Sequence, residues 1–208
     1  MKISAFMPTF NRPDFIVKAV EAILAQDYDN FEIIVKDGGD SIEHLLPKDA
    51  RIRYIGGRDR GITDAMNQAM AKATGDIFVW ANDDDLIAPG TFRFVIDNIG
   101  GHKWLVGRIL MGDQLYGETY NYERLKQNNI VPQPAVYWKR DLYNELGGMC
   151  EDQDLTSDYE YWLRIGKKYE PIWTDRVLAN YTVHEGQITQ KITGEQLAQA
   201  EQTRKKYL

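Results

Sequence analysis

Cysteine is almost absent from this chain of 208 residues, which contains only Cys150. A single thiol excludes both a disulfide bond within the chain and a zinc site built from cysteines. No apolar run approaches the roughly 18 residues needed to span a bilayer. The apolar run at the N-terminus is short and lacks the basic flank of a signal peptide. These absences predict a cytoplasmic protein without a transmembrane segment.

Basic residues are too few and too scattered to predict a nucleic-acid-binding surface. The net charge is −6, whereas binding to a duplex requires a basic stripe. The one basic run, Arg204-Lys205-Lys206, lies at the C-terminal end. It is compatible with peripheral contact to the inner face of an anionic membrane, although a run of this kind is more often a solvated chain end. The sequence therefore predicts no nucleic-acid partner.

The first hundred residues alternate between apolar runs and helical patterns. Ile16, Val20 and Ile23 repeat at helical spacing after Pro13, a residue that suits the first turn of a helix. We expect strands at 2–7, 31–35, 51–55 and 76–80, and helices from Pro13 onward and over 61–74. Strands that alternate with helices predict an α/β fold with a Rossmann-like, doubly wound and mostly parallel sheet.

Residues 101–208 are less regular and predict a smaller α+β half that ends in a helix. Strands are expected at 104–111, 135–138 and 172–183, and helices at 140–146, 157–168 and 195–207, whereas 118–127 fits either type. No linker separates this half from residues 1–100. We therefore expect one compact domain with a functional division near residue 100.

Polar clusters follow three of the predicted strands in the first half. They are Thr9–Arg12, Asp37–Gly39 and Asp83–Asp85. Ligands of open α/β sheets bind outside the carboxyl ends of the strands, where these clusters can meet. Loops after strands are often polar without having a function. Three such loops in one half, two of them rich in carboxylates, favour a nucleotide-type site.

The acidic triplet Asp83-Asp84-Asp85 is the strongest local signal for chemistry. Adjacent carboxylates repel one another unless a cation or hydrogen-bond donors compensate. Mg²⁺ in particular prefers one or two carboxylates together with substrate phosphates. A solvated acidic turn is an equally good reading of the triplet taken by itself, so its context decides.

The order and spacing of several motifs resemble family 2 of the nucleotide-sugar glycosyltransferases. The resemblance covers about the first hundred residues and rests on the stretches 7–12, 26–28, 31–39, 58–67, 73–76, 82–85 and 88–90. It implies the A-type glycosyltransferase (GT-A) fold, with a nucleotide-sugar-binding half at 1–100 and an acceptor-binding half at 101–208. One departure is Asp37-Gly38-Gly39-Asp40, where Asp-Asp-Gly-Ser is commoner, and it leaves the preferred base open.

The resemblance also implies roles for individual residues. Thr9 and Asp37 match positions that contact the base and ribose, with Asn11 and Arg12 beside Thr9. A second stretch implied to line the nucleotide pocket contains Asp59, Arg60, Asp64 and Asn67. The acidic triplet matches the family's DXD metal motif. It implies Asp85 as the first metal ligand, Asp83 as a further one, and Asp83 or Asp84 as partners of the ribose hydroxyls.

The stretch 156–165 resembles the family segment that holds the catalytic base, and the aligned residue is Asp158. Ser157 and Glu160 have the spacing of a capping box, which predicts Ser157 as the N-cap and Asp158 as the first helical residue. The helix dipole would stabilise an anion there, so we expect Asp158 to be ionised at neutral pH. An acidic residue in a first turn is also ordinary helix chemistry, and only the upstream motifs favour catalysis.

His184 lies in a stretch that resembles a His-x-Gly-Gln-like segment of the family. The resemblance implies a further metal or phosphate ligand, whereas a lone histidine after a strand is more often a surface residue. The same resemblance implies dependence on a divalent cation, Mn²⁺ or Mg²⁺.

Taken together, the resemblance implies an inverting transfer of a sugar from a nucleotide diphosphate, most simply a UDP-sugar, to an acceptor hydroxyl. The acceptor would be a saccharide, a lipid-linked molecule or a protein, in polysaccharide or glycoconjugate synthesis. A metal-dependent nucleotidyltransferase is one alternative, although the loop 8–12 contains no glycine for a phosphate loop. A non-catalytic nucleotide-sugar-binding module is another. The sequence leaves open whether the protein is an oligomer.

Overall fold

The computed structural model describes residues 1–185, 187 and 193–208. In its first half, four parallel strands lie in the order β3-β2-β1-β4. Their bounds are Ile3–Thr9 for β1, Phe31–Asp37 for β2, Ile52–Gly56 for β3 and Ile77–Trp80 for β4. Every residue of β1, β2 and β4 is buried, as expected for parallel strands that are covered on both faces.

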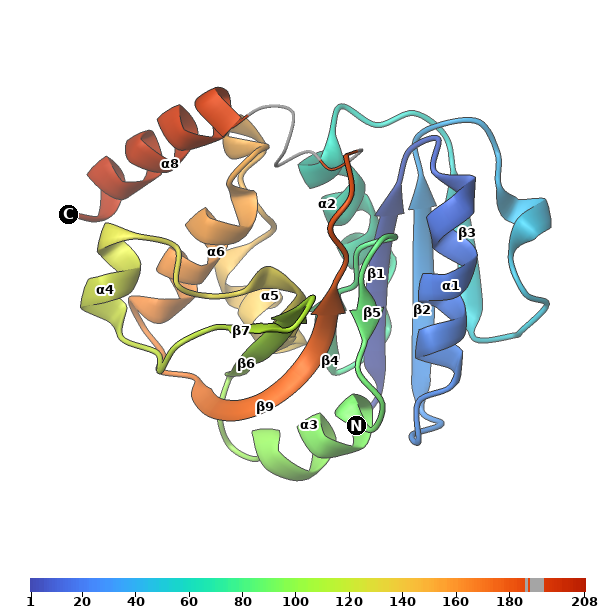
Figure 1. Cartoon of the computed structure of the whole chain (residues 1–208), viewed down its shortest axis with the longest axis horizontal. Helices are drawn as coiled ribbons and strands as arrows, with labels where there is room; N and C mark the ends of the chain where they lie inside the picture. The colour runs from blue at the N-terminus through green and yellow to red at the C-terminus, as the bar shows by residue number, and fades with distance from the viewer. Residues whose placement is uncertain (186, 188–192) are drawn as a thin grey trace.

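The second half continues the same sheet rather than forming another one. The order runs on from β4 through β8 (Val136–Lys139), β6 (Trp104–Met111) and β9 (Ile172–Tyr181) to β5 (Leu86–Ile87). Only the pair β6–β9 is parallel here, while β7 (Gln114–Tyr116) forms an antiparallel hairpin with β6. The sheet curls from one half into the other (Figure 1). The predicted α/β fold is confirmed, and the division near residue 100 stays a prediction.

Helices cover both faces of the sheet. On one face, α1 (Pro13–Leu24) and α3 (Thr91–Ile99) pack against alternate side chains of β1, among them Ala5 and Met7. On the other face, the core around Phe6 includes side chains from α2 (Ile62–Lys72), α5 (Arg140–Leu146) and α6 (Ser157–Gly166). Successive residues of a strand point to opposite faces, which places Phe6 in a different core from its neighbours.

The remaining elements belong to the second half or to the connections. They are α4 (Tyr122–Gln127), α8 (Thr193–Tyr207) and the 3₁₀ turns η1 (Glu43–Leu45), η2 (Gln133–Ala135) and η3 (Glu151–Gln153). The ambiguous segment 118–127 therefore ends in a helix, and the side chain of Asn121 caps it by accepting a hydrogen bond from the Arg124 N–H. The short strands β5 and β7 and the helix α3 were not among the predicted elements.

The predicted capping box at the start of α6 is wrong. Thr156 is the N-cap, no side chain caps the helix, and the Ser157 hydroxyl has no hydrogen-bond partner among the described residues. Glu160 accepts hydrogen bonds from Arg164 and Tyr207 instead. The hydrogen bond from Tyr207 of α8 and the ion pair with Arg164 thus take the place of the expected capping contact of Glu160.

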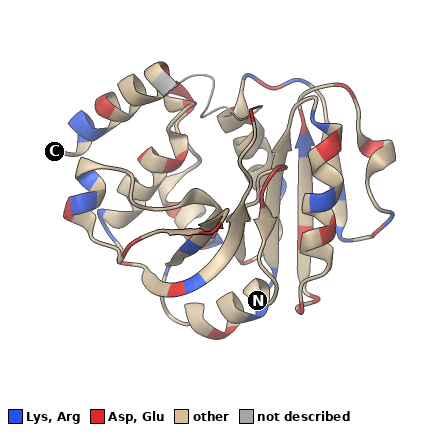
Figure 2. Ribbon diagram, in the orientation of Figure 1, with Lys and Arg blue, Asp and Glu red and all other residues tan. Residues whose placement is uncertain are grey.

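Both halves of the ribbon carry Lys and Arg residues as well as Asp and Glu residues (Figure 2). Among the described residues, no helix combines the length and the apolar composition that crossing a bilayer requires.

Candidate active site

A cavity of about 860 Å³ lies beyond the carboxyl ends of β1 and β4 and extends to the start of α6. Segments from both halves of the chain therefore line it. Its lining includes Thr9, Phe10, Asn11, Arg12, Phe15, Asp59, Gly61, Asn82, Asp83, Asp84, Gln133, Asp154, Ser157, Asp158, Tyr181 and His184. Its size suits a small-molecule ligand.

Two carboxylates of the acidic triplet line this cavity. Asp83 accepts hydrogen bonds from the Thr9 hydroxyl at 2.6 Å and from Arg12 at 3.2 Å. Asp84 accepts one from the same guanidinium at 2.7 Å, and its Oδ2 lies 3.0 Å from Nε2 of His184. Burial raises the pKa of Asp83, while the Thr9 hydrogen bond and the Arg12 charge oppose that rise. One arginine thus offsets much of the repulsion between the two carboxylates.

Asp85 lies behind the cavity wall and does not line it. Its carboxylate accepts hydrogen bonds from the Asn82 amide at 2.8 Å and from the Thr182 backbone N–H at 3.0 Å. Burial raises its pKa to about 7. Asp85 directly precedes β5, which pairs with β9, so its side chain connects the acidic triplet to the end of β9. The metal-ligand role expected for Asp85 stays a prediction, and this geometry favours Asp84 instead.

His184 follows the end of β9 and faces the cavity next to Asp84. Its ring stacks on Phe15 of α1, with centroids 4.4 Å apart and planes inclined by 27°. The strand β9 therefore delivers a histidine from the second half to the carboxylates of the first half. The family resemblance implied His184 as a further metal or phosphate ligand, and that role stays a prediction, but its contact with Asp84 in particular was not foreseen.

The described residues contain no group of three or more His, Cys, Asp or Glu side chains arranged to hold a metal ion. Asp84 and His184 are adjacent in the cavity and offer one oxygen and one nitrogen donor. A divalent cation that keeps substrate phosphates and waters among its ligands needs no more than one or two protein side chains. The donor set therefore fits a cation shared with a phosphate ligand rather than a metal site made by the protein alone.

Asp158 lines the same cavity and belongs to the second half of the chain, in the first turn of α6. Burial raises its pKa, against a backbone hydrogen bond and a hydrogen bond at 3.4 Å from the Asn129 amide. This direction is opposite to the shift that the helix dipole alone predicts. A carboxylate with a raised pKa holds a transferred proton better than an ordinary one, which suits a general base working near neutral pH.

Asn11 and Asp37, both expected in the nucleotide site, are placed differently. Asn11 lines the cavity in a left-handed backbone conformation (φ 53°), and its side chain accepts a hydrogen bond from the Asp40 N–H. Asp37 pairs with Thr9 in the sheet, but it is fully buried outside the cavity lining. Its carboxylate accepts hydrogen bonds from Tyr54 and from two backbone N–H groups. Its expected contact with base or ribose stays a prediction.

Arg60, Asp64 and Asn67 also lie outside the lining of the cavity. Arg60 pairs with Asp64 at 3.2 Å and with Glu151 at 2.6 Å on the surface. Asn67 forms hydrogen bonds with both the N–H and the C=O of Met149. In this structure these side chains join α2 to the loop before α6, and their expected roles in substrate binding stay predictions.

Asp59 does reach the cavity, and a buried lysine holds it there. The ammonium group of Lys36, which has no exposed surface, donates a hydrogen bond to Asp59 at 3.1 Å. A Cβ atom on Gly38 would lie 2.1 Å from Oδ2 of Asp59. The glycine in the Asp-Gly-Gly-Asp turn thus leaves the space that this carboxylate occupies.

Several lining residues were not predicted. Asp154 accepts a hydrogen bond from the Thr63 N–H at 2.9 Å and lines the cavity. Gln133 bridges the Asn82 side chain and the Trp80 carbonyl, each at 2.8 Å. No local signal could have identified them, because their partners lie more than 50 residues away in the chain.

Residues 4–150 match the sequence pattern of glycosyl transferase family 2. The chain belongs to this family. It is similar to an uncharacterised glycosyltransferase of Rickettsia conorii, with 25% identity over 92% of this chain and 35% of that protein. It is also similar to the uncharacterised glycosyltransferase YwdF of Bacillus subtilis, with 28% identity over 81% of this chain and 69% of that protein. The chain thus spans only about a third of the Rickettsia relative.

Solved structures show the same fold. A mannosyltransferase from Pyrobaculum calidifontis, in complex with GDP-Man and Mn²⁺, superimposes with a TM-score of 0.76 at 21% identity, over 98% of this chain and 64% of that one. TarS 1–349 of S. aureus in complex with UDP gives a TM-score of 0.75 at 15% identity, with the same coverage of 98% and 64%. The expected GT-A-type fold is therefore confirmed.

Proposed function

We propose that this chain transfers a sugar from a nucleotide diphosphate to the hydroxyl group of an acceptor, with inversion at the anomeric carbon. The observation that carries the proposal is the composition of one cavity. It unites Asp83, Asp84 and Arg12, which suit a phosphate–cation site, with Asp158, which suits a general base. Membership of family 2 supports the same class of reaction.

The donor would lie at the end of the cavity formed by β1 and β4. Thr9 and Arg12 hold Asp83 in place, and Asp59 offers a further acceptor for donor groups on a base or ribose. Asp84 and His184 are the residues that we propose to hold a divalent cation. When bound, such a cation neutralises charge on the departing diphosphate.

At the start of α6, Asp158 would accept the proton of the acceptor hydroxyl. The hydroxyl oxygen then forms a bond to the anomeric carbon while the bond from that carbon to the phosphate oxygen breaks. The electron pair of the broken bond leaves with the nucleotide diphosphate, and the proton stays on Asp158. Attack from the face opposite to the leaving group makes this single displacement inverting.

The donor is proposed to be a UDP-sugar, and the acceptor a saccharide, a lipid-linked molecule or a protein in the synthesis of a polysaccharide or glycoconjugate. Among similar structures, TarS was solved with UDP-GlcNAc and the Pyrobaculum enzyme with GDP-Man. The base preference of this chain is therefore a matter for direct measurement. A cytoplasmic location, with or without peripheral contact to the inner membrane face, and the oligomeric state stay predictions.

The proposal is tested by titrating the protein with UDP, GDP and their sugars in the presence of Mn²⁺ or Mg²⁺, followed by detection of the transferred sugar. Metal-dependent binding with transfer supports a glycosyltransferase. Binding without turnover would identify a non-catalytic module, and release of pyrophosphate from a nucleoside triphosphate would identify a nucleotidyltransferase.

A pair of variants assigns the metal ligand. We expect Asp84→Asn to lose metal-dependent nucleotide binding and Asp85→Asn to keep it, because Asp84 lines the cavity and Asp85 does not. Asp97→Asn, at an exposed aspartate of α3, is the matched control. If Asp85→Asn loses metal-dependent binding and Asp84→Asn keeps it, Asp85 is the metal ligand, as the family motif implied.

A further inference from the structure

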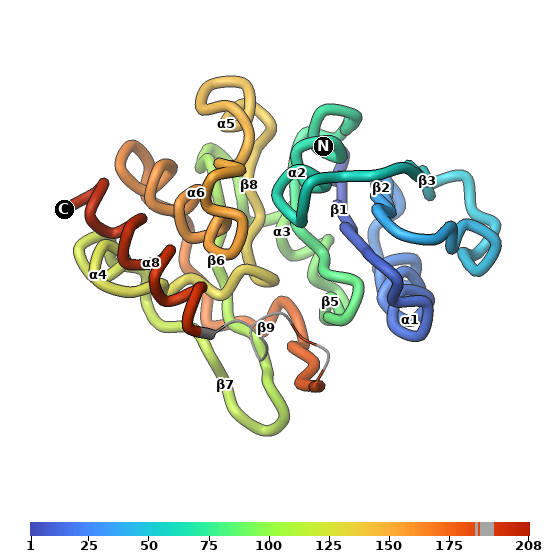
Figure 3. Tube along the Cα trace, turned by 90° about the horizontal axis from the view of Figure 1, so that it is seen from above, coloured from blue at the N-terminus to red at the C-terminus, as the bar shows by residue number. Residues whose placement is uncertain are grey.

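A second cavity, of about 520 Å³, lies beside the β6–β7 hairpin. More of its surface is apolar than polar, and its aliphatic side chains are those of Ile109, Met111, Leu115, Ile130 and Val131. Figure 3 shows this hairpin projecting from the sheet next to β9. Leu115 is 55% exposed at the edge of the cavity, so the apolar wall continues to the surface.

The second cavity adjoins the candidate active site. Tyr181, at the end of β9, lines both cavities. Asn129 lines the second cavity and donates its hydrogen bond to Asp158 of the first. Farther along the chain, Val131 lines the second cavity, whereas Gln133 lines the candidate active site. A molecule held on the Asn129 side of the second cavity is therefore close to Asp158.

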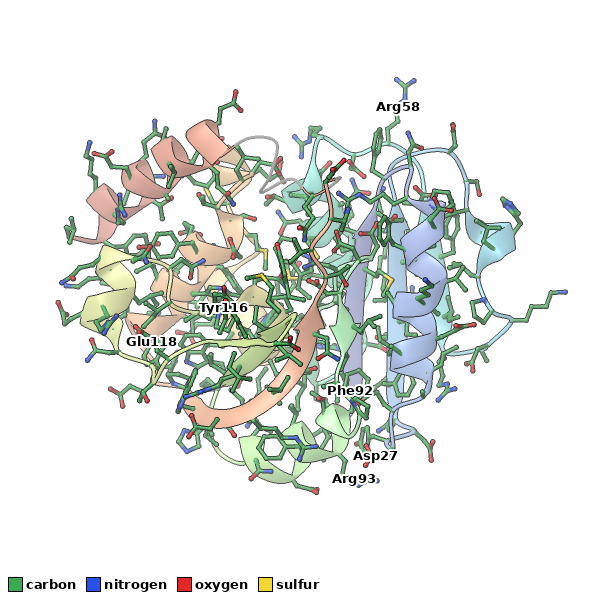
Figure 4. The ribbon with its side chains drawn as sticks, viewed as in Figure 1. Asp27, Arg58, Phe92, Arg93, Tyr116 and Glu118 are labelled. Atoms are coloured by element: carbon green, nitrogen blue, oxygen red, sulfur yellow. The ribbon has the colours of Figure 1, made fainter. Side chains whose placement is uncertain are left out.

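The charged side chains of the second cavity compensate each other. Arg124 and Glu118 form an ion pair with an N–O distance of 2.8 Å. Figure 4 labels Tyr116 and Glu118 on the segment that leads from β7 toward α4. The pair leaves little net charge to attract an anionic ligand, and the apolar surface of the lining exceeds its polar surface. An uncharged apolar group fits this lining best.

We propose that this cavity binds an aliphatic chain of the acceptor, so that the acceptor is an amphiphile whose hydroxyl end reaches Asp158 past Asn129 and Tyr181. The inference rests on the proposed function for the role of Asp158. It narrows the acceptor from three classes to a molecule carried on an alkyl or prenyl chain. Binding then depends on the length of the chain as well as on the sugar or alcohol at its end.

The test uses n-alkanols from butanol to octanol as probes of the chain alone, with methyl NMR signals of leucine and isoleucine as the readout. Burial of each further methylene is expected to tighten binding by up to about fourfold. Shifts should centre on Leu115 and Ile130. Equal affinity along the series, or tighter binding of benzyl alcohol than of hexanol, overturns the proposal.

The double variant Leu115→Gln/Ile130→Gln should abolish the dependence on chain length. The matched control is Leu45→Gln, at an exposed leucine of η1 that lines neither of these cavities. Titration of UDP or GDP with Mn²⁺ in the same samples reads the donor site separately. Nucleotide binding without alkanol binding refutes this inference alone, whereas alkanol binding without any nucleotide binding refutes the proposed function.

Discussion

Replacement of Asp158 by Asn separates the chemical step from the binding of the donor. The variant keeps the shape of the side chain but cannot take a proton. A positioned general base contributes about 10²- to 10⁴-fold to a rate, so we expect kcat to fall by that factor. The proposed donor site is formed by the ends of β1 and β4 rather than by α6, and nucleotide affinity should therefore change little.

The same change has a second, independent signature in the pH dependence of stability. Burial raises the pKa of Asp158, so the folded protein keeps this proton to a higher pH than the unfolded chain does. Between the two pKa values the free energy of unfolding falls as the pH rises, by about 1.4 kcal/mol for each pH unit of that window. Asn at this position does not titrate, so it removes this contribution to the pH dependence of the free energy of unfolding. Between the two pKa values of Asp158, the variant therefore loses less stability than the wild type as the pH rises.

The assays are single-turnover transfer, nucleotide titration and denaturant unfolding across a pH series. Asp152→Asn is the control, because Asp152 is an exposed carboxylate in the turn before α6. Full turnover in Asp158→Asn would refute the role of base. A difference in stability between variant and wild type that does not change with pH would refute the argument from burial.

Three further changes probe the surroundings of the site. Asn129→Ala removes a hydrogen bond that lowers the pKa of Asp158, so the pH–rate profile should shift to higher pH; an unchanged profile would contradict the contact. Gly38→Ala places a methyl group where Asp59 lies, so nucleotide affinity should fall while an added methyl at the open surface position Gly101 leaves it unchanged. Trp162→Ala should lower the free energy of unfolding by about 3–5 kcal/mol, because Trp162 is fully buried against Trp104 and Trp138. Denaturant unfolding measures this loss of stability. A loss below about 1 kcal/mol would show that neighbouring side chains fill the cavity left by the indole ring.

Most elements of the first half could be predicted because their signals are local. Buried apolar runs mark β1, β2 and β4, and Pro13 with its helical spacing marks α1. The helix α3 was overlooked although Phe92, Val95 and Ile99 have the right spacing and are buried, since the Pro89-Gly90 pair was read only as part of a motif. The hairpin β6–β7 likewise has a local turn signal in Gly112-Asp113 that was not used.

The second half was less predictable because its pairings are not local. Nothing in residues 136–139 indicates that β8 runs antiparallel to β4, or that β9 returns beside both β6 and β5. The capping box at Ser157 failed for the same reason. A local motif competes with contacts from a distant helix, and here the contact of Tyr207 with Glu160 prevails.

The sequence by itself determined the fold class, the family, and the acidic triplet and Asp158 as candidates for chemistry, because these depend on residue type, order and spacing. Only the tertiary structure decided which carboxylates face the cavity. Asp83 and Asp84 turn toward Arg12 and His184, whereas Asp85 turns toward the end of β9. Three adjacent aspartates are alike in sequence, and they differ in their contacts because the chain turns between them and distant residues form separate hydrogen bonds with each one.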